Sequence, residues 1–472
     1  MTASLSLHPD RLFPADPAQR DAAREIYKSI AGLPIISPHG HTNPAWFADD
    51  EPFPDPASLF IVPDHYVFRM LYSQGIALEG LGVPRADGGA SETDKRRIWR
   101  QFAENFHLFR GTPSRMWLSH AFREVFGIEE RPDASNADRI YDQIADCLSR
   151  PEFRPRALYE RFNIEVLSTT ESPLDDLRHH KKVAASGWKG RVVTAYRPDP
   201  VVDPQFTNFV GNVAELGRIT GRDTGNWSGY LDALADRRRY FKENGGCTST
   251  DHGHPTAFTA DLSRAEAEAL FARVIKGNAS AADAELFRGQ MLTEMARMSL
   301  EDGMTMQIHP GSFRDYNARV FQMFGKDKGC DIPTQTDYVH ALKPLLDRFG
   351  NERKLTIILF TLDETVYSRE LAPLAGHFPA LKLGPAWWFH DSPEGMRRYR
   401  EQVTETAGFY NTVGFNDDTR AFLSIPARHD VARRIDAGFL GRLVAEHRLD
   451  IDEALEVAHD LTYRLVKAAY KL

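Results

Sequence analysis

A histidine pair, His39-Gly40-His41, follows the first short apolar run of the chain at residues 33–37. Alternate residues of an extended segment point the same way, so both imidazoles of an H-x-H triplet can reach one ion. Asp418 follows the last apolar run, and its carboxylate can complete such a site if the strands close into a barrel. These three side chains predict a metal-assisted reaction, provided that the fold brings the two ends of the chain together.

The spacing of the pair is weak evidence by itself. With 17 histidines in 472 residues, roughly 0.6 H-x-H triplets are expected by chance. A second triplet, His252-Gly253-His254, does occur. The position of each triplet relative to the strands must therefore decide which of them carries chemistry.

Short β-rich segments alternate with helical sequence along most of the chain. We expect strands at 35–37, 164–170, 191–196, 247–250, 304–309, 355–362, 381–386 and 412–415. Strands that alternate with helices imply a parallel sheet, and eight such units are the number in a (β/α)8 TIM-type barrel. Residues 42–160 show amphipathic helices and no convincing strand. We interpret 1–41 and 161–472 as the barrel and 42–160 as a mainly helical insertion after the first strand.

Active sites of such barrels lie at the carboxyl ends of the strands. The residues found there are His39 and His41, Arg197, Asp251 and His252, His309, Trp387 and Trp388, and Asp418 with Arg420. Each has a plainer interpretation as well. A lone histidine is more often a surface or hydrogen-bonded core residue than a ligand, and a tryptophan pair can be core packing. The common position at strand ends favours a shared site.

Composition restricts the class of protein. A net charge of −8 gives no electrostatic reason to expect nucleic acid or an anionic membrane as a partner. No run of 18 apolar residues and no amino-terminal signal pattern occurs, so we expect a cytoplasmic protein. Three widely separated cysteines support neither a disulfide framework nor a zinc ribbon. The oligomeric state stays open, a homo-oligomer included.

Further motifs accompany these residues along nearly the whole chain. In order, the motifs are Asp10-Arg11-Leu12-Phe13, His39-Gly40-His41, Asp64-His65-Tyr66 with Arg69, Thr169-Thr170-Glu171-Ser172-Pro173, Arg197-Pro198-Asp199, Asp251-His252-Gly253, His309 with Arg314, Asn317 and Arg319, Trp387-Trp388-Phe389, and Asp418-Thr419-Arg420. Together they resemble the uronate isomerase family of the amidohydrolase superfamily. The chain departs from the family pattern at three positions: Gly40 stands where a cysteine is common, Thr42 replaces an apolar residue, and Asp417 stands where a threonine is usual.

The resemblance implies an aldose–ketose isomerase of hexuronate catabolism. It would convert D-glucuronate to D-fructuronate and D-galacturonate to D-tagaturonate through an enediol. The expected partner is a small hexuronate, and the expected cofactor is a divalent metal, zinc first, which turnover need not strictly require. His39, His41 and Asp418 would be the metal ligands.

The resemblance also suggests roles for the other strand-end residues. Asp418 or a hydroxide on the ion is one candidate base, and Tyr66 would carry the proton on the other side. His309 would be a further ligand or a polar contact to the sugar. The substrate would be bound by two arginines, an aromatic wall and one further histidine, which are Arg197, Arg420, Trp387, Trp388 and His252.

Two other functions remain as alternatives. A metal-dependent hydrolase of the same superfamily, such as a lactonase, would place a bridging Lys or Glu on the fourth strand, but 246–254 contains neither. A deaminase-like mononuclear site would need a histidine after the sixth strand, and 355–364 has none. A silent sugar-acid-binding protein would be expected to have lost Asp418 or the H-x-H triplet.

Overall fold

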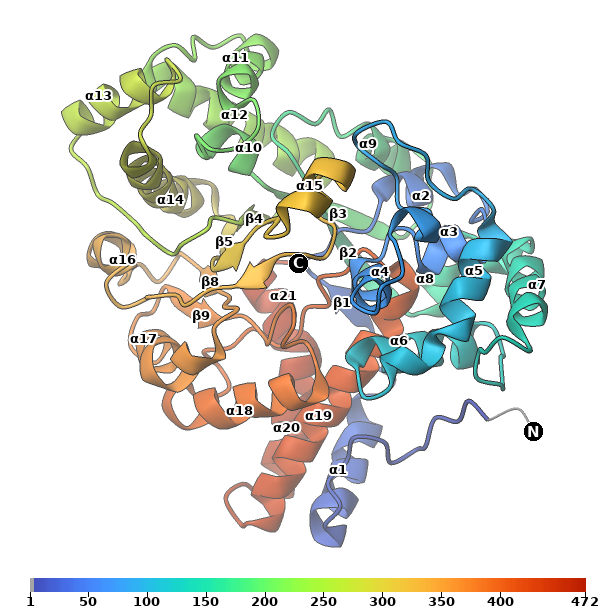
Figure 1. The fold of residues 1–472 in the computed structure, drawn as a ribbon. Coiled ribbons are helices and arrows are strands. Elements are labelled where there is room, and N and C mark those ends of the chain that lie inside the picture. The colour runs from blue at the N-terminus through green and yellow to red at the C-terminus, as the bar shows by residue number, and fades with distance from the viewer. Residues whose placement is uncertain (1–3) are drawn as a thin grey trace.

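A parallel sheet of seven strands curls around the centre of the molecule (Figure 1). The computed structural model describes residues 4–472. Every pairing in the sheet is parallel, in the order β1-β2-β3-β4-β5-β8-β9. The strands are β1 (Ile35–Ser37), β2 (Ile164–Glu171), β3 (Arg191–Tyr196), β4 (Ser249–His252), β5 (Thr305–Ile308), β8 (Ile357–Leu359) and β9 (Leu381–Leu383).

The eighth expected strand, at 412–415, is reduced to one parallel bridge between Leu383 and Thr412. Gly414 interrupts the extended backbone two residues later, with φ of 77°, a conformation that glycine adopts without strain. Beyond this segment the loops that follow the first and last units meet, because His41 N donates to Thr419 O at 3.0 Å. The arrangement is that of a TIM-type barrel, as the strand–helix alternation predicted, with a shortened last strand.

The two faces of the sheet pack against different partners. Met306 and Ile308 of β5 belong to a large apolar cluster with the outer helices, among them α12 (Trp227–Gly245) and α14 (Ala281–Asp302). Ile358 and Phe360 belong instead to a smaller inner cluster. Alternate side chains of a strand point to opposite faces, so this division identifies which residues face the barrel axis.

The C-terminal helix α21 (Leu465–Tyr470) closes the end of the barrel opposite the carboxyl ends of the strands. Its Val466 and Tyr470 share the inner cluster with Val166 and Val193, and Thr305 Oγ1 donates to Ala469 O at 2.6 Å. The C-terminus accordingly lies near the middle of the ring of strands in Figure 1. The interior of the barrel is a packed core, so a substrate can reach it only at the carboxyl ends of the strands.

Residues 42–160 form a helical body beside the barrel, drawn in blue to teal in Figure 1. Its apolar core contains aromatic residues such as Trp99, Phe102 and Phe122. The α-helices of this body are α2 (Pro44–Asp49), α3 (Pro56–Phe60), α4 (His65–Tyr72), α5 (Lys95–Glu104), α6 (Pro113–His120), α7 (Ala137–Leu148) and α8 (Pro155–Arg161).

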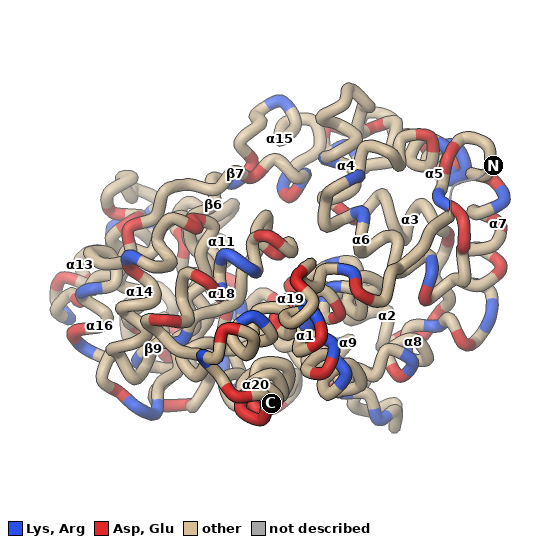
Figure 2. Tube along the Cα trace, turned by 90° about the horizontal axis from the view of Figure 1, so that it is seen from below, with Lys and Arg blue, Asp and Glu red and all other residues tan. Residues whose placement is uncertain are grey.

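The helices α1 (Pro17–Ile30), α19 (Ile425–Ala445) and α20 (Ile451–His459) pack side by side at the bottom of Figure 1. In the view of Figure 2, basic and acidic residues are interspersed over the outer elements. Among the described residues, no helix combines the length and the apolar character that crossing a membrane requires.

Candidate active site

The alternation along β4 and β5 decides which strand-end residues face the barrel axis. Asp251 pairs in register with Gln307, and His252 pairs with Ile308. Ile308 packs against the outer helices, whereas Gln307 Nε2 donates inward to Ser249 Oγ at 3.2 Å. Asp251 therefore points into the barrel mouth, and His252 points away from it.

His39, His41 and Asp418 lie together at this mouth. Asp418 Oδ1 is 3.5 Å from His39 Nε2 and 3.2 Å from His41 Nε2. Ligands about 2.1 Å from a tetrahedral ion are separated by roughly 3.4 Å, so these spacings fit one zinc-sized cation. Burial alone would raise the pKa of Asp418, but the imidazoles of His39 and His41 hold it well below its usual range. Asp418 also has φ of 36°, an uncommon backbone conformation of the kind found at functional sites.

A second carboxylate, Asp251, completes the cluster. Its Oδ1 is 2.8 Å from His309 Nδ1, and its Oδ2 is 3.1 Å from Arg197 Nη1 and 4.0 Å from His39 Nε2. Burial would raise the pKa of Asp251, but Arg197 and the two histidines hold it well below its usual range. The cluster of His39, Asp251 and His309 is fully buried and adjoins the first triad through His39.

His309 is oriented by packing on both of its faces. Its ring stacks on Phe360 at 4.0 Å between centroids and on His39 at 5.0 Å. Its Nε2 atom is buried and has no hydrogen-bond partner within residues 4–472. Burial lowers the pKa of His309, although Asp251 opposes this shift. The ring is therefore neutral near pH 7 and has one nitrogen free for a ligand.

The two tryptophans have different surroundings. Trp387 packs edge-on against His309 at 4.7 Å, and its indole nitrogen donates to Asp418 Oδ2. Trp388 lies farther out, 5.8 Å from the ring of His65 and 5.4 Å from the guanidinium carbon of Arg314. Trp387 thus orients a candidate ligand, whereas Trp388 contributes to the rim of the mouth.

Tyr66 reaches the mouth from the helical body. Asp64 caps α4 by accepting from Tyr66 N at 2.8 Å, which places Tyr66 in the first turn. Its hydroxyl donates to Asp391, 3.2 Å from Oδ2, and Arg428 Nη1 donates to the same oxygen at 2.6 Å. Burial and Asp391 raise the pKa of Tyr66 well above its usual range, and Asp418 is near enough to contribute. The hydroxyl therefore keeps its proton at neutral pH.

The two arginines expected to bind substrate differ in availability. Arg197 is held between Asp199, 2.8 Å from its Nε, and Asp251. Arg420 is more than one-third exposed and contacts only Asp327 among the described carboxylates, at 3.1 Å. Arg420 has one partly exposed ion pair and is therefore the more available of the two for a substrate carboxylate, whereas Arg197 is bound by two carboxylates.

His252 lies outside this group of residues. It is the last residue of β4 and is fully buried on the side away from the barrel axis, where its Nε2 is 2.9 Å from Thr250 Oγ1 and its ring lies against that of His254. We therefore do not retain it as a substrate contact. Gly253 of the same triplet serves another purpose, because a Cβ at this position would collide with the Arg197 guanidinium.

Sequence reasoning gave no role to Asp251, Asp391 or Arg428. Asp251 stands at a predicted strand end. Side chains alternate between the two faces of a strand, so Asp251 shares the inner face with Ser249, and this pattern could have favoured Asp251 over His252. Asp391 and Arg428 had no such signal, because they lie in a loop and on a helix that only the tertiary fold brings beside Tyr66.

The comparisons with known proteins all indicate the same family. Residues 17–470 match the family model described as glucuronate isomerase. A protein named uronate isomerase from Phenylobacterium zucineum is 69% identical over 472 residues, which covers 100% of this chain and 98% of that protein. The crystal structure of glucuronate isomerase from Caulobacter crescentus superposes with a TM-score of 0.98 at 60% identity, covering 99% of this chain and 98% of that one. For uronate isomerase from Thermotoga maritima the TM-score is 0.91 at 26% identity, with 98% and 99% covered.

Proposed function

The chain belongs to the glucuronate isomerase family, and on that premise we propose how its residues convert an aldose hexuronate into the ketose. The reaction is an aldose–ketose isomerisation. The substrates we propose are D-glucuronate and D-galacturonate, with D-fructuronate and D-tagaturonate as products. The supporting observation is that two proton-handling groups and a divalent-cation site converge at the mouth of one barrel.

Such an isomerisation moves hydrogen from C2 to C1 of the open-chain sugar. A base must remove the C2 proton, and a proton must then reach C1, while the oxygen that gains charge is stabilised. A third requirement is a group that holds the substrate carboxylate, for which the guanidinium fork is suited.

We assign the metal ligands to His39, His41 and Asp418, with zinc as the ion. Two imidazole nitrogens and a carboxylate oxygen are zinc donors, and their separations fit the ion. A bound zinc ion would act as a Lewis acid on the sugar oxygens. Trp387, which donates to the second oxygen of Asp418, keeps that carboxylate turned toward the two histidines.

We assign to His309 the role of the base that removes the C2 proton. Both oxygens of Asp418 are engaged, one with the histidines and one with Trp387, whereas the Nε2 atom of His309 has no protein partner. Asp251 lies 2.8 Å from the opposite nitrogen and stabilises the ring when it takes up a proton. Asp418 remains the competing base.

Tyr66 is the proposed acid on the other side of the substrate. Its hydroxyl is protonated and held by Asp391, which Arg428 holds in turn. Arg420 is the proposed contact for the substrate carboxylate, and Trp388 is the proposed aromatic wall at the rim. Arg197 acts through Asp251, because its guanidinium is already bound to that carboxylate.

The test is a proton NMR time course with D-glucuronate in D2O. We expect D-fructuronate to form with deuterium at C1, and we expect His309→Gln to abolish that exchange while Tyr66→Phe slows turnover. Removal of the ion with a chelator should lower the rate, and zinc should restore it. Exchange that survives in His309→Gln but disappears in Asp418→Asn would reassign the base to Asp418. Release of acid from a sugar lactone without isomerisation would favour the hydrolase alternative.

A further inference from the structure

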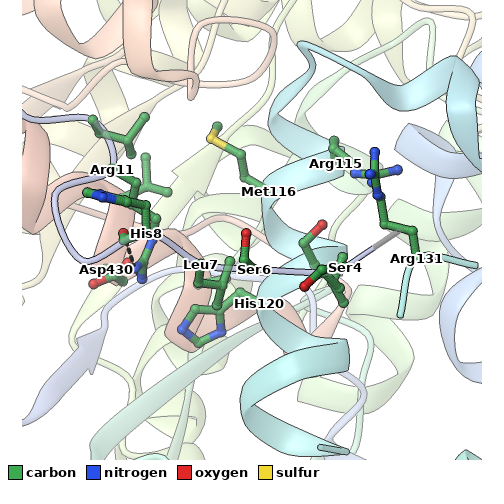
Figure 3. A pocket seen from close by; sticks show the side chains of 15 residues that line it. Ser4, Ser6, Leu7, His8, Arg11, Arg115, Met116, His120, Arg131 and Asp430 are labelled. Carbon is green, nitrogen blue, oxygen red and sulfur yellow. Dashed lines mark hydrogen bonds and ion pairs between the residues drawn. The ribbon is translucent and has the colours of Figure 1, made fainter. Parts of the chain in front are cut away.

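A pocket of about 480 Å³ lies outside the barrel, between the N-terminal segment 4–12 and the helices α6 and α19 (Figure 3). Leu5 N donates to Glu129 O at 2.7 Å, and Ser4 forms a bridge with Glu130, so this segment closes one side of the pocket. None of the residues proposed for catalysis lines it. Its volume is within the range of sites that hold small molecules.

Two arginines stand next to each other at one end of this pocket. Figure 3 shows the Arg115 and Arg131 side chains together, one from α6 and one from the loop that precedes α7. Across residues 4–472, no carboxylate lies within ion-pair distance of either guanidinium, although most arginines of this chain have such a partner. The Nε atom of Arg131 is buried without a hydrogen-bond partner. Burial, together with the neighbouring Arg131 and Arg110, lowers the pKa of Arg115 to about 10.

The acidic group that lines the pocket does not compensate these charges. Asp430 is already bound by Arg11 at 2.5 Å and by Arg434 at 2.9 Å, and it accepts from the Tyr27 hydroxyl. Two partly buried cations therefore face a cavity in which no free carboxylate is found among the described lining residues. An anion bound between them would be attracted by both charges.

We propose that this pocket binds a small anionic metabolite whose carboxylate or phosphoryl oxygens lie between Arg115 and Arg131. Guanidinium groups suit both anions, because each presents parallel N–H donors to two oxygens. The Ser6 and Ser119 hydroxyls, which also line the pocket, are placed for a polar part of the ligand, and Met116 offers an apolar contact. The site is separate from the barrel mouth and does not depend on the proposed isomerase mechanism.

The experiment measures the melting temperature of the intact protein against inorganic phosphate and against acetate, with sodium chloride keeping the ionic strength constant. We expect a saturable rise with at least one of the two anions, because an anion bound only to the folded state stabilises it. Arg131→Gln should weaken the apparent affinity at least tenfold, and Arg131→Lys should weaken it less. A response to phosphate alone identifies a phosphoryl ligand, and a response to acetate alone identifies a carboxylate ligand.

Two variants separate this site from other anion effects. Arg154→Gln removes the same charge from an exposed position of the helical body that does not line this pocket, and it should respond like the wild type. Arg420→Met should also respond normally, because Arg420 lies at the barrel mouth. The proposal is wrong if neither anion stabilises the wild type, if Arg131→Gln keeps the full response, or if Arg420→Met loses it. If Arg131→Gln does not fold, Arg115→Gln serves as the second variant.

Discussion

Replacing Arg428 by methionine tests the network behind Tyr66. The Arg428 guanidinium is almost fully buried, its Nη1 is 2.6 Å from Asp391 Oδ2, and its carbon lies 3.5 Å from the centre of the Trp117 ring. Methionine fills much of the same space and removes the charge. The Asp391 carboxyl then stays buried with the Tyr66 hydroxyl as its remaining side-chain donor.

The expected loss of stability follows from the burial of the Arg428–Asp391 ion pair. Removing one member of a buried ion pair typically destabilises a protein by about 3–5 kcal/mol, because the partner charge is left without compensation. Urea unfolding of Arg428→Met should therefore show a free energy of unfolding lower by that amount. Asp391→Asn removes the other charge, and the double variant should lose clearly less than the sum of the two single changes.

Turnover provides a second measurement of the same network. If Arg428 acts by holding Tyr66 through Asp391, Arg428→Met should lower kcat in the wild type and lower it no further in a Tyr66→Phe background. A stability loss under about 1 kcal/mol would show that the pair is solvated rather than buried. A kcat effect of equal size in both backgrounds would refute the link through Tyr66.

Other expected outcomes concern single residues. Asp418→Asn should lower kcat by orders of magnitude with an unchanged circular dichroism spectrum; turnover near wild type would remove it from the site. Arg420→Met should mainly raise KM, and a KM unchanged from wild type would mean that another group holds the substrate carboxylate. His252→Gln should leave KM within about twofold and lower the stability by about 1 kcal/mol, the usual value of one hydrogen bond; a large rise in KM would return it to the site. Burial raises the pKa of Glu171 from 4.5 to about 7, so its contribution to stability is complete below pH 4.5 and is lost as the pH rises through 7. Glu171→Gln should flatten the melting temperature between pH 5 and 8, and an unchanged slope would contradict the raised pKa.

Sequence patterns were sufficient for the order of the strands, because each β/α unit has its own apolar run and the barrel repeats one local rule. They failed where the structure departs from that rule. The last strand shrinks to one bridge because Gly414 turns the backbone after Val413. Its segment is apolar and β-rich all the same, so the sequence alone predicted a full strand.

Some residues of the candidate site could likewise be predicted from the sequence, and others could not. The H-x-H pair and Asp418 could be predicted, since alternation and strand-end position are local properties. The choice between Asp251 and His252 depends on a shift of one residue, which reverses the face that a side chain occupies. The contact of Asp391 with Arg428 depends on how a loop meets a distant helix, and no spacing along the chain encodes it.

The triad proposed as the metal site spans the chain from His39 to Asp418, and the helix that closes the barrel floor ends at Tyr470. During synthesis the two histidines emerge hundreds of residues before the aspartate. An amino-terminal fragment that stops short of Asp418 therefore has two imidazoles and no carboxylate to complete the triad. Binding of an ion at the proposed site would therefore be a late event, coupled to completion of the whole fold rather than to any early folding unit.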